Sequence, residues 1–225
     1  DPALTVKAEG GYRIEVANNK IVLTAKGILG IFYCGKGIRQ LITLQGNLFV
    51  VREVSISDYP VFSWRSVMLD EARYFKGKEA VKTLLYEMAR LKMNTFHWHL
   101  TDDQGWRIEI KKYPRLTEVG AWRVDRTDVP FHSRRNPERG ELTPIGGFYT
   151  QEEIREIVAY AADRQIEVIP EIDVPAHSNA ALAAYPQFAC PVVKDFIGVL
   201  PGLGGRNSEI IYCAGNDSVF TFLQD

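Results

Sequence analysis

Residues 67–100 decide the fold, and their sequence is VMLDEARYFKGKEAVKTLLYEMARLKMNTFHWHL. The first three residues, 67–69, form a short apolar run that ends at Asp70. Between residues 79 and 91 apolar side chains recur at helical spacing, and residues 94–100 have the length and composition of a strand. A strand, a helix and a second strand in this order predict a right-handed βαβ unit in a parallel sheet.

The same alternation continues further along the chain. Thr150 is a predicted helix N-cap, and Glu153 stands three residues later, where a capping box has its acidic residue. The helix is expected over residues 152–164, and residues 167–172 are expected to form a third strand. A further helix is expected over residues 217–223.

A smaller module precedes this pattern. Residues 4–25 alternate between polar and apolar side chains, and Asn18-Asn19 between the two halves predicts a hairpin turn. Helical spacing follows over residues 27–44, and a strand is expected over residues 48–56. We therefore predict that residues 1–57 form part of a small α/β domain.

Only three parallel strands can be counted in residues 58–225. A (β/α)8 TIM barrel needs eight strands and typically about 250 residues. A three-stranded parallel sheet by itself would leave ladder groups and apolar faces uncovered. Residues 58–225 are therefore expected to be the N-terminal part of a barrel, truncated after about three strands.

The charge balance excludes some partners. Lys and Arg number 27 against 28 Asp and Glu, which gives a net charge of −1 and no electrostatic reason to expect nucleic acid or an anionic membrane. No apolar run reaches the roughly 18 residues of a membrane span. The chain has three cysteines, Cys34, Cys190 and Cys213. Two alternatives stay open: a disulfide between Cys190 and Cys213, or three thiols.

Polar residues gather where the predicted strands end. Arg65 and Asp70 bracket the first strand, the second strand ends in residues 97–106, and the third ends in residues 171–177. In parallel α/β folds the functional groups lie at the carboxyl ends of the strands. Three of the four histidines of the chain fall in these segments, so we expect a functional site there.

Each of these residues also has a purely structural interpretation. Arg65 can be an ion-pair partner of Asp70 or Glu71, and the pair Asp102-Asp103 can cap a turn. His97 and His99 can be buried histidines with satisfied nitrogens, and His177 can be a loop residue.

Four motifs follow one another along the chain: WRSVMLDEARYF at residues 64–75, HWHLTDDQGW at residues 97–106, GFYT at residues 147–150 and EIDVPAH at residues 171–177. In this order they resemble the motifs of glycoside hydrolase family 20, the β-N-acetylhexosaminidases. The resemblance covers roughly residues 58–225.

The resemblance implies a (β/α)8 barrel that removes terminal β-linked GlcNAc or GalNAc with retention of configuration. The acetamido oxygen of the substrate attacks the anomeric carbon, one of the exceptions to the two-carboxylate scheme. In the family an Asp-Glu pair, within a His-x-Gly-Gly-Asp-Glu string, orients this group and protonates the leaving oxygen. The sequence contains no such string, so we expect the isolated chain to be inactive.

The resemblance also implies roles for individual residues. Arg65 is expected to bind sugar hydroxyls at the non-reducing end, because its rigid donor fork suits a vicinal diol. Asp102 is expected to orient the imidazole of His177, which touches the acid Glu and tunes its pKa. A supporting role is expected for three further residues, Asp173, Asp103 and His99.

Two positions depart from the family pattern. Ser66 and Ala176 stand where the family usually has glycine. Ala176 precedes His177 and would displace it if the backbone there required a positive φ. We expect both changes to be tolerated.

Two rival functions are kept. His97 and His99, with His177 and Asp173 nearby, imitate the zinc site of a metal-dependent barrel hydrolase. The chain can also be an inactive or sugar-binding fragment. The family resemblance itself implies no metal and no cofactor.

The expected partner is an oligosaccharide or glycoconjugate with a terminal N-acetylhexosamine. A second chain carrying the rest of the barrel is a further expected partner. The resemblance implies a secreted, periplasmic or lysosomal location.

Overall fold

The computed structural model describes residues 9–203 and 210–225, which form two compact units. The first unit comprises the chain up to Val67 together with residues 84–95 and 161–167. The second unit comprises the remaining residues of the described ranges. The strand pattern predicted from residue 4 onward begins in residues 4–8, which lie outside the described residues.

A three-stranded antiparallel sheet forms the first unit. Its order is β2–β1–β5, where β1 is Tyr12–Ala17, β2 is Lys20–Ala25 and β5 is Val54–Asp58. Asn18 and Asn19 both have positive φ, of 50° and 57°, as a two-residue hairpin turn with the right twist requires. The predicted hairpin is therefore confirmed.

Helix α1, Gly27–Leu41, packs against this sheet and ends three residues before the predicted end. The alternation of β1 places its apolar side chains on the face that the helix covers. The core of the unit consists of Tyr12, Ile14, Val16, Tyr33 and Cys34.

The strand predicted over residues 48–56 is wrong as a single element. A hairpin of β3, Thr43–Gln45, and β4, Leu48–Val50, comes first, and β5 begins only at Val54. Gly46, at φ 61°, reverses the chain between β3 and β4. The sequence pattern missed the break because residues 48–56 are rich in strand-forming side chains throughout.

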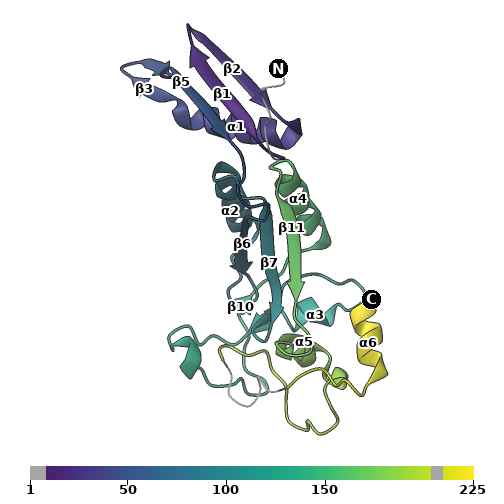
Figure 1. Cartoon of the computed structure of the whole chain (residues 1–225). Coiled ribbons are helices and arrows are strands. Elements are labelled where there is room, and N and C mark those ends of the chain that lie inside the picture. The colour runs from purple at the N-terminus through teal and green to yellow at the C-terminus, as the bar shows by residue number, and fades with distance from the viewer. Residues whose placement is uncertain (1–8, 204–209) are drawn as a thin grey trace. The chain divides into compact units, whose positions relative to one another are not determined.

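Most of the sheet β11–β7–β6 lies in the second unit, with β6 at Ser66–Asp70, β7 at Thr95–Asp102 and β11 at Glu167–Ile172. Figure 1 shows the arrows of the three strands pointing the same way. The amide of Thr95 donates to the carbonyl of Arg65, so β6 and β7 start beside each other. The three predicted parallel strands are thus present. β8, Gly105–Trp106, folds back antiparallel on the end of β7.

Two long helices connect these strands, α2 at Lys78–Arg90 and α4 at Gln151–Ala162. At the start of α4 the backbone N–H of Glu153 donates to Oγ1 of Thr150 at 3.1 Å. The backbone N–H of Thr150 in turn donates to the Glu153 carboxylate at 3.1 Å. This reciprocal pair is the predicted capping box.

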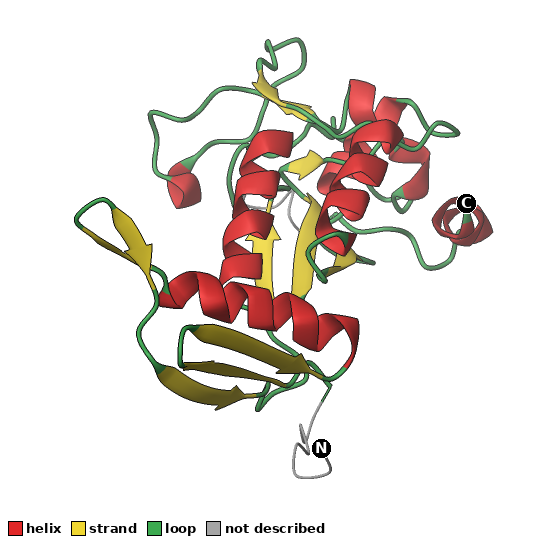
Figure 2. Cartoon of the chain, turned by 90° about the horizontal axis from the view of Figure 1, so that it is seen from above, coloured by secondary structure: helices red, strands yellow, loops and turns green. Residues whose placement is uncertain are grey.

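Long loops and short helices gather at the end of the sheet to which its strands point (Figure 2). The sequence missed most of these short elements because they span too few residues to show a period. The predicted final helix is confirmed as α6. The short elements and the final helix are α3 (Arg115–Glu118), β9 (Trp122–Arg123), the 3₁₀ turn η1 (Phe131–Ser133), β10 (Ile145–Gly146), α5 (Asn179–Ala184), the 3₁₀ turn η2 (Pro186–Phe188) and α6 (Asp217–Gln224).

Strand β7 separates the core of the second unit from the polar residues. Phe96, Trp98 and Leu100 alternate on one face and are each at most 1% exposed. The ring centroids of Trp98 and Tyr149 lie 4.8 Å apart in an edge-on contact, which fixes this face of the strand. The opposite face carries His97 and His99.

All three cysteines are free thiols, so the open choice between a disulfide and thiols is decided for thiols in this structure. An isolated antiparallel bridge between Ala189 and Tyr212 brings Cys190 and Cys213 near each other. Burial and a hydrogen bond with Cys213 raise the pKa of Cys190, the hydrogen bond being the larger cause. Among the helices of the described ranges, none combines the length and apolarity of a membrane span.

The core of the first unit generates a matched pair of variants. Ile14 is fully buried in β1, whereas Ile21 in β2 is about half exposed. Ile14→Ala is expected to lower the free energy of unfolding of this unit by about 2–5 kcal/mol, and Ile21→Ala by less than about 1 kcal/mol. Urea unfolding followed by circular dichroism measures both, and equal losses would contradict the sheet register.

Candidate active site

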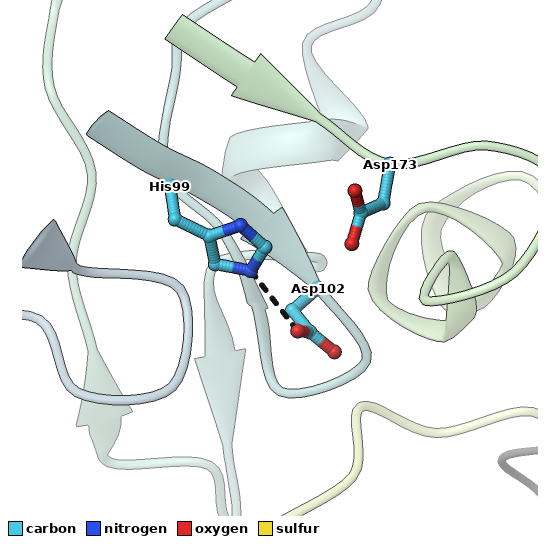
Figure 3. Close-up of side chains that lie close together, drawn as sticks. All are labelled: His99, Asp102 and Asp173. Atoms are coloured by element: carbon cyan, nitrogen blue, oxygen red, sulfur yellow. Dashed lines mark hydrogen bonds and ion pairs between the residues drawn. The ribbon is translucent and has the colours of Figure 1, made fainter. Parts of the chain in front are cut away.

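Acidic residues stand at the carboxyl ends of all three parallel strands. Asp70 is the last residue of β6, Asp102 is the last residue of β7, and Asp173 follows β11 directly. The carboxyl edge of a parallel sheet is where α/β proteins place their functional groups. Figure 3 shows Asp102 and Asp173 with His99 beside them at this edge.

Asp102 is the centre of the cluster, and its carboxylate is completely buried. Its Oδ2 lies 2.5 Å from a guanidinium nitrogen of Arg73 and 3.0 Å from Nε2 of His99. Its Oδ1 accepts hydrogen bonds from the backbone N–H of Asp103 at 2.6 Å and from Nδ1 of His177 at 3.0 Å. Both oxygens are therefore fully occupied by donors.

These donors keep Asp102 ionised. Burial would raise the pKa of the carboxyl, but the hydrogen bonds from His99 and the Asp103 amide, together with the charge of Arg73, outweigh it and lower the pKa. A buried ionised carboxylate needs such partners, since a lone buried charge costs several kcal/mol. Asp102 thus acts as a fixed negative charge beneath the site.

Arg73 connects the ends of β6 and β7. Its guanidinium lies 2.6 Å from the Asp70 carboxylate and 2.5 Å from that of Asp102, and about a third of its side chain is exposed. The backbone N–H of Arg73 donates to Asp70 at 2.9 Å, which closes the turn after β6. Arg73 is a member of the cluster to which the sequence motifs assigned no role, although its position three residues beyond the end of a strand was a usable signal.

His177 is the most exposed member of the cluster, with 52% of its side chain accessible. Its backbone has φ 50°, a left-handed conformation in which histidine is more frequent than most residues. Because the ionised Asp102 accepts from Nδ1, this nitrogen carries a proton, and in the neutral tautomer that results Nε2 has the lone pair. Ala176 does not have a positive φ, which agrees with the expected tolerance of alanine there.

Asp103 differs from its neighbour. It is buried, and its Oδ1 accepts the backbone N–H of Asn179 at the start of α5. Burial, with the nearby charge of Asp102, raises the pKa of Asp103. Its Oδ2 lies 3.7 Å from Nδ1 of His177, so Asp103 lines the histidine from a second side.

Asp173 lies on the open side of the cluster. Its backbone N–H donates to Oγ1 of Thr101, which ties the end of β11 to β7. The carboxylate is within 4.8 Å of the ligand atoms of His99 and Asp102. Burial, with the charge of Glu171 among the smaller causes, raises the pKa of Asp173.

His99 and His97 point to the same face of β7, as the alternation predicted. Nδ1 of His99 lies 2.9 Å from Oε1 of Glu171, an ion pair by distance that is not aligned as a hydrogen bond. Nε2 of His97 contacts Oε2 of the same carboxylate. Burial lowers the pKa of His99, but the hydrogen bond to Asp102 and the charges around it, Glu171 among them, outweigh burial and raise it.

A buried arginine braces the turns around the site. The Arg107 guanidinium is surrounded by backbone carbonyls rather than carboxylates, and burial lowers the pKa of Arg107 to about 9. Its donors reach the carbonyls of Glu71, Ala72, Gln104, Ala121 and Gly147. The segments that follow β6 and β7 are thereby held together.

Arg65 is not brought to this cluster. It precedes β6, whereas the cluster lies at the far end of the same strand, roughly 15 Å away for a strand of this length. Its guanidinium donates to the carbonyls of Lys92 and Phe62 and to the hydroxyl of Tyr33, all within the first unit. These contacts give Arg65 a structural role within the first unit, and its sugar contact stays a prediction.

Within residues 9–203 and 210–225, two groups of side chains have metal-like spacing, namely His99, Asp102 and Asp173, and Asp102, Asp103 and His177. Both depend on Asp102, whose oxygens are already occupied by Arg73, two imidazoles and a backbone amide. A cation here would meet the charge of Arg73 at 2.5 Å from the shared oxygen. This donor set does not fit a metal ion.

Removing the Asp102 charge is expected to destabilise the second unit. In Asp102→Asn, Arg73 and His99 lose their shared counter-ion, at a cost of about 2–4 kcal/mol at pH 7, below the range for fully buried pairs because solvent screens Arg73. The folded pKa of Asp102 is lowered, so its contribution is complete above the ordinary value of 3.8 and is lost as pH falls through the folded value.

The difference between parent and Asp102→Asn is therefore expected to shrink below about pH 4. Urea unfolding at pH 7 and at pH 3.5 measures the difference at both values, and other acids cancel because both proteins carry them. An equal difference at the two pH values would refute the ionised buried carboxylate.

Known proteins match this chain along its length. A beta-hexosaminidase of Porphyromonas gingivalis is 43% identical over the whole chain, which spans 27% of that relative. A beta-hexosaminidase of Vibrio furnissii is 48% identical over 80% of the chain, and the match covers 29% of that relative. The chain thus spans less than a third of the length of these relatives.

A solved structure agrees with the sequence matches. The β-N-acetylhexosaminidase of Bacteroides fragilis superposes with a TM-score of 0.77 at 39% identity, over 96% of this chain and 39% of that one. The family model of the glycosyl hydrolase family 20 catalytic domain matches residues 62–225, which contain every strand end described above. The chain belongs to glycosyl hydrolase family 20.

Proposed function

We propose that the protein to which this chain belongs is an exo-β-N-acetylhexosaminidase that releases terminal β-linked GlcNAc or GalNAc with retention of configuration. The observation that carries the proposal is the ionised, fully occupied Asp102 that aims His177 at the carboxyl edge of the sheet. The names of the relatives, beta-hexosaminidase and N,N'-diacetylchitobiase, support the same reaction class.

The architecture proposed for the whole protein is a (β/α)8 barrel. In it β6, β7 and β11 are the first three strands, residues 58–225 are the N-terminal part of the catalytic domain, and residues 1–57 belong to a preceding small α/β domain. The parallel order β11–β7–β6 and the start of the family match at residue 62 support this division.

The chemical step proposed is substrate-assisted. The acetamido oxygen of the sugar attacks the anomeric carbon while a protonated carboxyl group releases the leaving oxygen. An intramolecular nucleophile of this kind is worth an effective molarity of about 10⁵–10⁸ M, so the protein needs no covalent nucleophile. Its task is to hold the ring and to supply the proton.

His177 and Asp102 are proposed to support the acid. With Nδ1–H given to Asp102, Nε2 of His177 is an acceptor that can hold a neighbouring carboxyl proton in place. Asp103 and Asp173 are proposed as supporting acids whose raised pKa reduces charge repulsion beside Asp102. Arg73, rather than Arg65, is proposed to bind sugar hydroxyls, because its guanidinium is part of the cluster and partly exposed.

The proton-donating Glu is proposed to come from residues outside this sequence. The sequence contains a single Asp-Glu dipeptide, Asp70-Glu71. The Glu71 side chain is fully buried and accepts from the Tyr149 hydroxyl and from two backbone amides, so it cannot reach a substrate. Either the continuing chain or a second chain is proposed to complete the barrel.

The substrate proposed is an oligosaccharide or glycoconjugate with a terminal N-acetylhexosamine. Related solved structures support this class, since the Streptomyces plicatus and Vibrio harveyi enzymes are found in complex with GlcNAc. A secreted, periplasmic or lysosomal location is proposed on the family resemblance alone.

The isolated 225-residue chain is expected to show no turnover of p-nitrophenyl β-GlcNAc, whereas the full-length protein hydrolyses it. The physical reason is the missing Asp-Glu pair. Acid catalysis by its Glu is worth on the order of 10²–10⁴-fold, and without its Asp the acetamido group is left unoriented. Absorbance of released p-nitrophenol measures the rate. Activity of a homogeneous chain would overturn the mechanism, and an inactive full-length protein would overturn the function.

The two arginines that bracket β6 give a discriminating test in the full-length protein. Arg73→Lys is expected to lower kcat/KM about 10- to 100-fold, because a charged hydrogen bond is worth roughly 1.5–3 kcal/mol and lysine lacks the fork. Arg65→Lys is expected to lower thermal stability and to leave KM unchanged. The reverse result would restore the sugar contact to Arg65.

A further inference from the structure

Five side chains form an unbroken series of alternating imidazoles and carboxylates across the second unit. Nδ1 of His177 is 3.0 Å from Asp102, whose other oxygen is 3.0 Å from Nε2 of His99. Nδ1 of His99 is 2.9 Å from Glu171, and the other oxygen of Glu171 contacts Nε2 of His97. We name this series His177–Asp102–His99–Glu171–His97 the relay.

The strand geometry explains why these residues meet. His97 and His99 are two residues apart on β7, so their side chains point to the same face. Glu171 lies on β11, the neighbour of β7 in the sheet, and its two carboxylate oxygens reach both imidazoles. One carboxylate on β11 therefore fixes two histidines on β7.

The relay is buried in the middle and open at both ends. The Asp102 side chain is 0% exposed and that of His99 is 5% exposed, whereas His177 and His97 are accessible. A buried imidazole between two carboxylates is favoured in its doubly protonated form, because the cationic ring then has a negative charge on either side.

Other charged groups face His99 from the neighbouring elements. Asp70 comes from the end of β6 and contributes to the raised pKa of His99, while Arg73 after β6 binds both Asp70 and Asp102. Asp103 and Asp173 are also near, and burial raises the pKa of both. The acids that contact the His99 ring within 3.0 Å are Asp102 and Glu171.

We propose that Glu171 and His99 are positioning residues, which act behind Asp102 to fix the orientation of His177. Glu171 holds His99 in the doubly protonated form, and the Nε2–H of His99 then fixes Oδ2 of Asp102. The other oxygen of Asp102, Oδ1, then faces His177 and accepts its Nδ1–H. His97 holds the far oxygen of Glu171 and keeps that carboxylate in place.

The catalytic meaning of the relay rests on the proposed function, but the relay itself does not. Without Glu171, a neutral His99 would have one N–H and two tautomers, and only one tautomer donates to Asp102. Asp102 would then lose a cationic neighbour and part of its hold on His177. Nothing in this chain of contacts requires a bound sugar.

The histidine content of the chain makes the relay directly testable by NMR. The chain has four histidines, of which three belong to the relay and His132, in η1, lies outside it. Imidazole ¹⁵N spectra of the unsubstituted chain are expected to show both ring nitrogens of His99 protonated at pH 7. A neutral His99 ring with a single N–H at pH 7 would overturn the proposal without any substitution.

The Glu171→Gln variant tests the link between the strands. An opposite charge within a few ångströms favours the charged imidazole, so its removal is expected to lower the pKa of His99 by about 1–2 units. The His132 signals serve as the internal reference within each sample. Glu167→Gln is the matched control, because Glu167 is an exposed glutamate at the other end of the same strand.

The His99 titration is expected to be the same in Glu167→Gln as in the parent. Two results would overturn the relay: an unchanged His99 titration in Glu171→Gln, or an equal displacement in the Glu167→Gln control. These spectra need no enzymatic activity, so they judge the relay even if the proposed function fails.

A second measurement uses the full-length hydrolase. In Glu171→Gln the acidic limb of the kcat/KM profile is expected to move to higher pH, because Asp102 loses the charge of His99 and its pKa rises. A merely structural role would lower kcat/KM by the same factor at every pH, and that result would refute the positioning role. A parent protein with no activity would refute the proposed function and leave the NMR result standing.

Discussion

The ionised carboxylate of Asp102, sealed from water at the end of β7, is the interaction on which the rest of the site depends. A buried charge is tolerated only with close partners, and Asp102 obtains them from three separate segments. Arg73 comes from the turn after β6, His99 from β7 itself and His177 from the loop after β11. If any of these segments were displaced by an ångström or two, the carboxylate would lose a partner in the low-dielectric interior.

The parallel sheet meets this demand because it brings the strand ends to one edge. The aromatic side of β7 is rigid, with Trp98 packed edge-on against Tyr149, so the polar side has a fixed base. Arg107 then ties the turns after β6 and β7 to each other through backbone carbonyls. The apolar core thus affects the site indirectly, because it sets the distances among polar side chains that it does not contact.

The carboxyl groups of the cluster differ in pKa, in a way that suits a site that transfers protons. Asp102 has a lowered pKa, whereas Asp103 and Asp173, within the same few ångströms, have raised ones. Donors account for the difference: Asp102 receives four, and the other two acids receive fewer while facing its negative charge. Neighbouring carboxyl groups with separated pKa values can play different parts in one reaction.

The sequence by itself determined the features that depend on local spacing. The capping box of α4, the Asn18-Asn19 turn and the three parallel strands follow from short motifs whose chemistry permits few alternatives. The pairing of Asp102 with His177 was expected from the family resemblance. Only the tertiary structure decided which side chains meet across the sheet. Arg65 and Arg73 lie at opposite ends of β6, and the Glu171 contact with His99 depends on the register of β11 against β7. The physical reason is that spacing along a chain fixes which face a residue occupies, whereas contacts between strands depend on how the whole sheet is packed.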